Sequence, residues 1–413
     1  MGKNVVVFAG YDSNDANNLW VTDGTAVGTH EIAVANAKAT GLYPDDLTAY
    51  NGEVLFNAQD AQGDFNLWVT DGTATGMKEL QVAGSDPTIG LNPSNLTVYK
   101  GKVFFDGYDA SGNQNLWVTD GTAAGTHEIA SPPSLIAYSG DYTVYKGELL
   151  FGGYDANGNI GLWKTDGTAA GTKEITAGAT PYGLDPSDLT LYQGRVLFAG
   201  DDVYVSGTHS HGHLARGVHL WVTDGTATGT HEINVAGADT TIGLRPSDLT
   251  PYDGKVFFSG YDSQGQDNLW VTNGTAAGTH EINVAGAASA GLDPSGLTLY
   301  KGDLFFTGND SSGKTGLWKT DGTAAGTHEI NVAGVNPDYG LYPSDFLLYG
   351  DKLLFAGYDS GNKVGLWETD GTAAGTKEIV AGANAPPLGL YPTELTVLNR
   401  QAADAVGVLP SSG

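Results

Sequence analysis

The side chains best suited to metal chemistry lie in one histidine-rich loop of this chain. Four of its nine histidines fall in the loop at residues 209 to 219, namely His209, His211, His213 and His219. In an extended strand the first three would share one face, an arrangement that suits Zn²⁺, Cu²⁺ or Ni²⁺, with Asp201 or Asp202 nearby. We therefore expect one transition-metal ion at this loop, with a flexible, solvated loop as the alternative.

A second candidate site is a set of residues that recurs at one equivalent position along the chain. Six of its members are acidic: Asp46, Asp141, Asp188, Asp248, Asp345 and Glu394. If their carboxylates point toward a common centre, they form a partial ring that attracts a cation or a polyhydroxyl ligand. If they point sideways, they satisfy turn hydrogen bonds next to the preceding Pro and Ser. The sequence leaves both orientations open.

Acidic residues also recur in two kinds of turn. Asn273 opens one turn of the pattern Asn/Asp-Gly-Thr, and Asp opens seven others at Asp23, Asp71, Asp120, Asp166, Asp224, Asp321 and Asp370. Because Asn accepts the same turn hydrogen bond without a charge, we expect these side chains to bind backbone N–H groups rather than cations. The Asp-x-x-Gly loops at Asp109, Asp155 and Asp262 resemble calcium loops, but they lack the several carboxylates that Ca²⁺ needs. Calcium therefore stays only an alternative here.

The elements that must position these residues follow from an internal repeat. A Leu-Trp pair recurs at intervals of 46 to 58 residues, at Trp20, Trp68, Trp117, Trp163, Trp221, Trp270, Trp318 and Trp367. Each unit contains four short β-like runs and no helical periodicity, which indicates the blades of a β-propeller. We expect the tryptophans to fill the core between blades rather than to stack on sugars.

One unit shows how the four strands of a blade are predicted. The runs are 246–252, 255–259, 268–272 and 279–284, and Asp253-Gly254 between the first two is a hairpin signal. The second run is apolar throughout its centre, as expected of a strand covered on both faces. The fourth is polar and charged, which protects an exposed sheet edge from pairing with other chains.

The two ends of the sequence complete one blade. The N-terminal segment 5–8 matches a second strand with no first strand before it, and 392–398 matches a first strand with no partner after it. The sequence therefore predicts one all-β domain over residues 1–413, an eight-bladed β-propeller of four-stranded antiparallel blades. The C-terminal strand closes the ring by pairing with the N-terminal blade. An insertion at residues 201–219 falls in the fifth blade.

Composition excludes several classes of function. The 413 residues include 47 acidic and 19 basic side chains, a formal net charge of −28, and no cysteine. Nucleic acid is a poor partner because its affinity comes largely from Lys and Arg. No stretch approaches the roughly 18 apolar residues that span a bilayer, and the N-terminus shows no signal peptide. Disulfides and cysteine nucleophiles are absent.

The unit Leu-Trp-Val-Thr-Asp-Gly-Thr-Ala-Ala-Gly-Thr at residues 116–126 resembles the ELWxxDGTxxGT repeat of bacterial secreted and cell-surface proteins. The resemblance covers essentially the whole chain and implies a β-propeller at an extracellular or cell-surface location. This sequence departs from the pattern by having Asn, Gly or His where Glu usually precedes Leu-Trp.

A ring of similar units offers equivalent sites to a repetitive ligand. We therefore expect a monomeric, non-catalytic extracellular binding or adhesion propeller, lectin-like in binding carbohydrate or another cell-surface ligand at repeated sites. One alternative is a metal-dependent enzyme that uses the loop at 209–219. The other is a structural repeat module whose acidic surface serves solubility.

Overall fold

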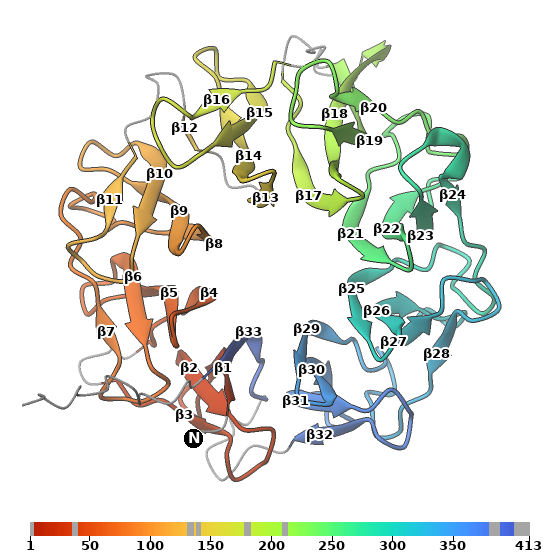
Figure 1. The fold of residues 1–413 in the computed structure, drawn as a ribbon. Coiled ribbons are helices and arrows are strands. Elements are labelled where there is room, and N and C mark those ends of the chain that lie inside the picture. Colours follow the sequence, from red (N-terminus) through yellow and green to blue (C-terminus); the bar gives the residue numbers. More distant parts are fainter. Residues whose placement is uncertain are drawn as a thin grey trace, which may run out of the picture.

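The computed structural model of the chain describes residues 4–34, 40–129, 136–137, 142–176, 183–208, 214–379 and 389–399. Eight sheets stand around a central channel, as Figure 1 shows, so the predicted eight-bladed β-propeller is confirmed. The described residues contain one short helical turn, η1 (Ala276–Gly278), and no helix that is long and apolar enough to cross a membrane.

Each blade has four strand positions, and we letter the blades A to H from the one that contains β1. The innermost strands are β33 (Thr393–Leu398), β4 (Asp45–Tyr50), β8 (Ser94–Tyr99), β12 (Ile136–Ala137) with β13 (Thr143–Tyr145), β17 (Ser187–Tyr192), β21 (Ser247–Tyr252), β25 (Ser295–Tyr300) and β29 (Ser344–Tyr349). The second strands are β1 (Val5–Tyr11), β5 (Glu53–Gln59), β9 (Lys102–Tyr108), β14 (Glu148–Tyr154), β18 (Arg195–Thr208), β22 (Lys255–Tyr261), β26 (Asp303–Asn309) and β30 (Lys352–Tyr358).

The two outer positions complete the blades. The third strands are β2 (Asn17–Thr22), β6 (Phe65–Thr70), β10 (Gln114–Thr119), β15 (Ile160–Thr165), β19 (Leu214–Thr223), β23 (Asp267–Thr272), β27 (Thr315–Thr320) and β31 (Val364–Thr369). The outermost are β3 (His30–Glu31), β7 (Lys78–Glu79), β11 (His127–Glu128), β16 (Lys173–Glu174), β20 (His231–Glu232), β24 (His280–Glu281), β28 (His328–Ile330) and β32 (Lys377–Ile379).

Blade A contains both ends of the described chain. Its innermost strand β33 pairs antiparallel with β1, and Val5 lies opposite Leu398 while Val7 lies opposite Thr396. The predicted ring closure is thereby confirmed. Closure gives β1 an inner partner, so blade A has the same four strand positions as the other blades and the edge of β1 is protected from pairing with other chains.

The core lies between adjacent blades and is built by the second and third strands. Trp270 on β23 is 2% exposed and stacks on Phe258 of β22 with ring centroids 6.4 Å apart. Its indole N–H donates to the carbonyl of Gly260 at 2.9 Å, and a Cβ on that glycine would lie 3.1 Å from the indole ring. The tryptophans of all eight units are at most 9% exposed. They form core, as the sequence predicts.

The outermost strand is shorter than the sequence predicts. In blade F, β24 covers only His280 and Glu281 of the expected run 279–284, because only these two residues pair with β23. The insertion in blade E has a different result. It lengthens β18 and β19 into a hairpin whose pairing extends from Gly200 opposite His219 to Val203 opposite Arg216 and beyond.

Candidate functional site: the central channel

The recurrent acids of the innermost strands sit at a bulge with unusual backbone geometry. Asp46 has φ of 55° and Asp248 has φ of 56°, and the pairing of β4 with β5 shifts register between Asp45 and Thr48. Asp and Asn tolerate this left-handed region better than most residues. The bulge turns the side chain out of the ordinary alternation of the strand.

Each described carboxylate of this set crosses to the next blade. Asp46 Oδ2 accepts from Leu96 N–H at 2.8 Å, Asp188 Oδ2 from Leu249 N–H at 3.0 Å, and Asp248 Oδ2 from Gly296 N–H at 2.7 Å. Around the closing blade, Asp345 Oδ1 accepts from Glu394 N–H at 3.3 Å and Glu394 Oε2 from Leu47 N–H at 3.3 Å. The side chains thus point sideways and join blades, rather than satisfying turns within their own blade. Asp141 lies outside the described residues.

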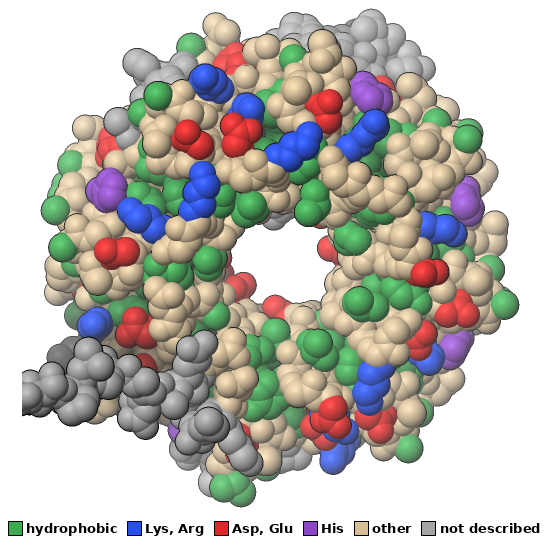
Figure 2. Space-filling view, in the orientation of Figure 1, with side chains coloured by type: hydrophobic (Ala, Val, Ile, Leu, Met, Phe, Trp, Pro, Cys, Tyr) green, Lys and Arg blue, Asp and Glu red, His purple; other side chains and the backbone are tan. Residues whose placement is uncertain are grey.

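Burial changes the protonation of these acids. Removal from water, with a smaller contribution from the nearby Asp45 carboxylate, raises the pKa of Asp46 to about 6. Burial also raises the pKa of Glu394, again with help from Asp45. Asp45, Asp46 and Glu394 thus lie close together where blades A and B meet at the channel, and Figure 2 shows acidic side chains on the channel wall.

A ring of apolar side chains stands near the other end of the innermost strands, one residue before their last position. Its exposed members are Val98 at 45%, Val144 at 44%, Leu191 at 50%, Leu299 at 51% and Leu348 at 51%. Figure 2 shows hydrophobic side chains gathered around the channel mouth. Ala49, in the equivalent position of β4, is three residues from Asp46, or about 10 Å along a strand. This ring was not predicted from the sequence, although every unit has an apolar residue at this position.

A second feature that the sequence analysis missed is a buried carboxyl between blades C and D. Asp106 on β9 is fully buried and accepts hydrogen bonds from the Tyr142 hydroxyl and from Asn95 Nδ2, the latter at 2.9 Å. Burial raises the pKa of Asp106 to about 7. Two departures from the repeat indicated this pair in the sequence. Tyr142 stands where most units have Leu, and Asp106 stands where the other units have an uncharged residue.

The predicted metal site is not supported, and this is a correction. Among the described residues, no group of three or more His, Cys, Asp or Glu side chains could hold a metal ion. His219 instead places its Nδ1 atom 3.3 Å from Glu232 Oε1, across β19 and β20. His209, His211 and His213 lie outside the described residues. The expected Zn²⁺, Cu²⁺ or Ni²⁺ ion is therefore withdrawn.

The turn acids bind backbone, as predicted. Asp120 Oδ1 accepts from Thr122 N–H at 3.0 Å, and Asn273 Oδ1 accepts from Thr275 N–H at 3.1 Å in the same geometry. In the loop between β9 and β10, Asp109 Oδ1 accepts from the N–H groups of Ser111 and Asn113. The calcium alternative is wrong for the described loops, because their carboxylates are engaged in turns and no metal-binding group is found there.

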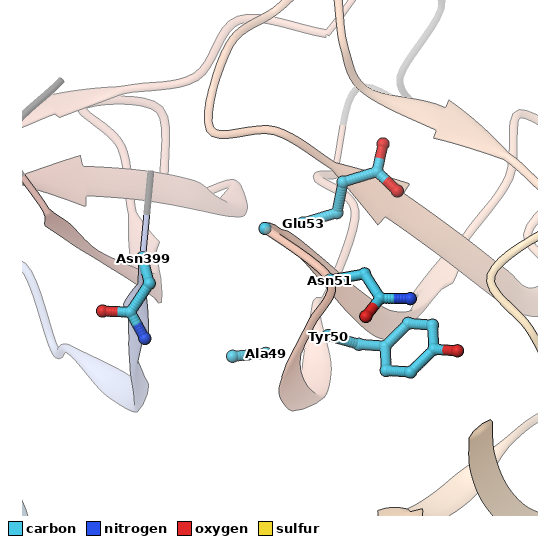
Figure 3. Close-up of a pocket in the computed structure, with 6 residues that line it drawn as sticks. Ala49, Tyr50, Asn51, Glu53 and Asn399 are labelled. Carbon is cyan, nitrogen blue, oxygen red and sulfur yellow. The ribbon is translucent and has the colours of Figure 1, made fainter. Parts of the chain in front are cut away.

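A tyrosine at the end of each innermost strand except β33 forms a hydrogen bond to the next blade. A tyrosine hydroxyl donates to a backbone carbonyl of the next blade at Tyr50, Tyr99, Tyr145, Tyr192, Tyr252, Tyr300 and Tyr349. At the end of β33 the equivalent residue is Leu398, which has no hydroxyl. A pocket of about 390 Å³ lies beside this position, between Asn399 and the turn at Asn51, as Figure 3 shows.

Comparisons with known proteins bear on the fold. No family model matches the sequence, and no curated protein matches it. A mutant puromycin hydrolase bound to PGG is 14% identical with a TM-score of 0.53, over 85% of this chain and 55% of that one. A puromycin-hydrolyzing peptidase of Mycobacterium tuberculosis is 15% identical with a TM-score of 0.50, over 84% of this chain and 55% of that one. The chain thus spans about half the length of these proteins, and the likeness shows the fold.

The comparisons correct the function expected from the sequence. The solved structures named above are a puromycin hydrolase and a puromycin-hydrolyzing peptidase, rather than lectins or adhesins, so the expected adhesion propeller with lectin-like carbohydrate sites is wrong. The structural-module alternative stays a prediction, because a shared fold does not test it. The metal-dependent enzyme loses its support, because no metal-binding group is found among the described residues. The monomeric state and the cell-surface location stay predictions, as does the absence of catalysis by the chain itself.

Proposed function

We propose that this chain is a substrate-handling propeller of the peptidase kind, whose channel takes a polypeptide segment with apolar side chains and a positive charge. The observation that carries the proposal is the channel wall, which is apolar near one end of the innermost strands and acidic near the other. The names of the solved structures with this fold, a puromycin hydrolase and a puromycin-hydrolyzing peptidase, support a substrate of the peptide class.

The apolar ring supplies the contact area. Soluble proteins seldom gather exposed large apolar side chains in one place, and such patches commonly mark binding sites. Leu191, Leu299 and Leu348 are each about half exposed, so each has apolar surface left to bury. Burial of that surface on an incoming segment would be favourable at roughly 25 cal/mol per Å².

The acidic end supplies the preference for positive charge. Asp45 is exposed beside the partly buried Asp46 and Glu394, and the formal charge of the chain is −28. A lysine or a free amino terminus near these carboxylates would lower their pKa and gain charge-assisted hydrogen bonds. An acidic segment would be repelled.

The test is fluorescence anisotropy with a labelled short peptide of alternating Leu and Lys and with its counterpart of alternating Leu and Glu. We expect binding of the basic peptide only, weakened about fivefold in Asp46→Asn with Glu394→Gln, which is equivalent to about 1 kcal/mol. Both substitutions keep an oxygen that accepts from the next blade. Asp120→Asn in an outer turn, where Asn273 is the natural counterpart, is the matched control and should change nothing.

Acidity gives a second readout. Because the pKa of Asp46 is raised to about 6, lowering the pH from 8 to 5 should neutralise this carboxyl and weaken binding of the basic peptide. The Asp46→Asn variant should show a smaller pH effect. Equal binding of the acidic peptide, or unchanged binding in the double variant, would overturn the proposal.

A further inference from the structure

One position of the repeat alternates between asparagine and glycine. It is the residue immediately before Leu-Trp on the third strand of each blade. Asparagine occupies it in blades A, B, C and F, at Asn18, Asn66, Asn115 and Asn268. Glycine occupies it in blades D, G and H, at Gly161, Gly316 and Gly365, and blade E has His219. The structure shows what the asparagine amide does and what its loss leaves behind.

The asparagine amide joins a backbone donor to a carboxylate. Its Oδ1 accepts from a leucine N–H in the connection to the next blade: Leu42 to Asn18 at 3.3 Å, Leu91 to Asn66 at 3.1 Å, and Leu292 to Asn268 at 3.1 Å. Its Nδ2 donates to an acid of the same blade: Asn18 to Glu31 at 2.8 Å, Asn115 to Asp109 at 3.2 Å, and Asn268 to Asp262 at 3.5 Å. A primary amide is thus the group that this part of the blade accommodates.

Blade G keeps both ends of this arrangement without the amide. Gly316 replaces the asparagine, and neither the Leu341 N–H nor the Glu329 carboxylate has a hydrogen bond among the described residues. The Glu329 side chain leans over the glycine, with Oε1 2.2 Å from the place of a Cβ. A pocket of about 220 Å³ lies between these groups and is also lined by Asp310 and Asn336. Its volume has room for several waters at about 30 Å³ each.

The pocket is lined by two carboxylates, Glu329 and Asp310, and by one cation, Lys314, so its lining favours a hydrogen-bond donor at Glu329 over an anion. Burial raises the pKa of Glu329, and the Asp310 carboxylate raises it further. Asp310 itself accepts from the backbone N–H groups of Ser312 and Lys314, so it is held in place by its turn. A ligand that enters must therefore donate a hydrogen bond toward Glu329 while it accepts one from Leu341.

We propose that this pocket binds a primary carboxamide, such as the Asn or Gln side chain of a partner polypeptide, in place of the missing asparagine. The ligand N–H donates to the Glu329 carboxylate and the ligand oxygen accepts from the Leu341 N–H. The site lies between β27, β28 and the connection to blade H, so it is independent of the channel. Blades D and H carry the same replacement, with Glu174 and Glu378 leaning over Gly161 and Gly365.

The experiment uses the full chain labelled with ¹⁵N-leucine and follows leucine amide resonances while acetamide is added. We expect the Leu341 amide, assigned by its loss in Leu341→Ile, to shift in a saturable way. The Leu292 amide is the internal control and should not shift, because Asn268 already occupies that place. N,N-dimethylacetamide has no N–H and acetate carries a negative charge, so neither should shift Leu341.

Two variants separate a built site from a surface effect. Gly316→Asn should abolish the acetamide shift by filling the pocket as in blade F. Its Cβ would lie 2.2 Å from Oε1 and 3.1 Å from Cγ of Glu329, so that side chain must move aside. Glu329→Gln should weaken acetamide about threefold, since a neutral acceptor forms a hydrogen bond roughly half as strong, and should admit acetate. A shift of Leu341 that persists in Gly316→Asn, equal shifts with N,N-dimethylacetamide, or no shift at all would overturn the proposal.

Discussion

Two interfaces between adjacent blades, which we call seams, depart from the repeat: one has lost a polar group and the other has gained two. The seam between blades A and B has lost a polar group, because Leu398 stands where a tyrosine hydroxyl would donate to the next blade. The seam between blades C and D has gained two, because Asp106 and Tyr142 meet within its apolar core. In the first case a pocket of about 390 Å³ lies at the surface of the seam. In the second the core stays closed.

The difference shows which changes a repeat tolerates singly and which it tolerates only in pairs. When a hydroxyl is lost near the surface, water can donate to the carbonyl that it leaves behind, so the free energy of unfolding falls only slightly. A carboxyl placed in a core needs a hydrogen-bonding partner at the same time, since an unpaired buried polar group costs about 1 to 3 kcal/mol. Asp106 and Tyr142 satisfy that requirement together.

The largest effect should come from removing the closing strand. A chain that ends at Tyr391 lacks β33, so β1 loses its inner partner and the fully buried Leu398 is gone. Burying one leucine is worth about 1.5 to 3 kcal/mol, and the strand carries several hydrogen bonds in addition. Thermal unfolding should occur at a markedly lower temperature, and size-exclusion chromatography should show association through the exposed edge. A truncated chain that melts and elutes like the full chain would refute closure as a source of stability.

The buried carboxyl should give the next largest effect, through pH. The folded-state pKa of Asp106 is raised to about 7, above its usual value of 3.8, so folding favours the protonated form. Its contribution to stability is therefore complete at low pH and is lost as the pH rises through about 7, at up to about 1.4 kcal/mol per pH unit. Chemical denaturation of Asp106→Asn between pH 5 and 8 should show a flatter profile than the unchanged chain. Parallel profiles would contradict the assignment.

The pairing of Asp106 with Tyr142 can be measured by a double-mutant cycle. Tyr142→Phe alone removes a donor and should cost about 1 to 3 kcal/mol, because the buried carboxyl then lacks one partner. Asp106→Ala with Tyr142→Phe introduces residue types that other blades have at these positions, and should cost less than Asp106→Ala and Tyr142→Phe together. Additive costs for the two positions would show that they are not coupled.

The smallest effect should be a gain at the closing seam. Leu398→Tyr would restore the hydroxyl that seven other innermost strands provide, and should stabilise the chain by about 0.5 to 1.5 kcal/mol. Tyr145→Phe is the matched control, since it removes the equivalent bond to the Gly194 carbonyl, 2.6 Å long, and should cost the same amount. Loss of stability in Leu398→Tyr would mean that the seam has no room for the ring.

The fold was predictable because every blade repeats the same local signals. The hairpin at Asp253-Gly254, the apolar centre of β22 and the tryptophan of β23 agree with one another in each unit, so the strand order and the closure by β33 followed from the sequence. The length of β24 was not predictable, since the polar run at 279–284 does not show where pairing with β23 ends.

The site was less predictable because it depends on geometry between units. The bulge at Asp46 gives that residue a φ of 55° and turns its carboxylate toward Leu96 of the next blade, which alternation along a strand does not indicate. The pocket beside Gly316 is visible only by comparing what Asn268 does in another blade. Both features become visible only when equivalent positions of different blades are compared.

The pairing of β1 with β33 also determines how the ring would respond to pulling. Val5 begins β1 and lies directly opposite Leu398, which ends β33, so the two outward ends of this pair emerge at the same place. A force that draws these ends apart acts across the hydrogen bonds and breaks them one after another, starting at Leu398. The ring therefore opens like a zipper at low force, whereas a pair loaded along its strands would have to break all its bonds together.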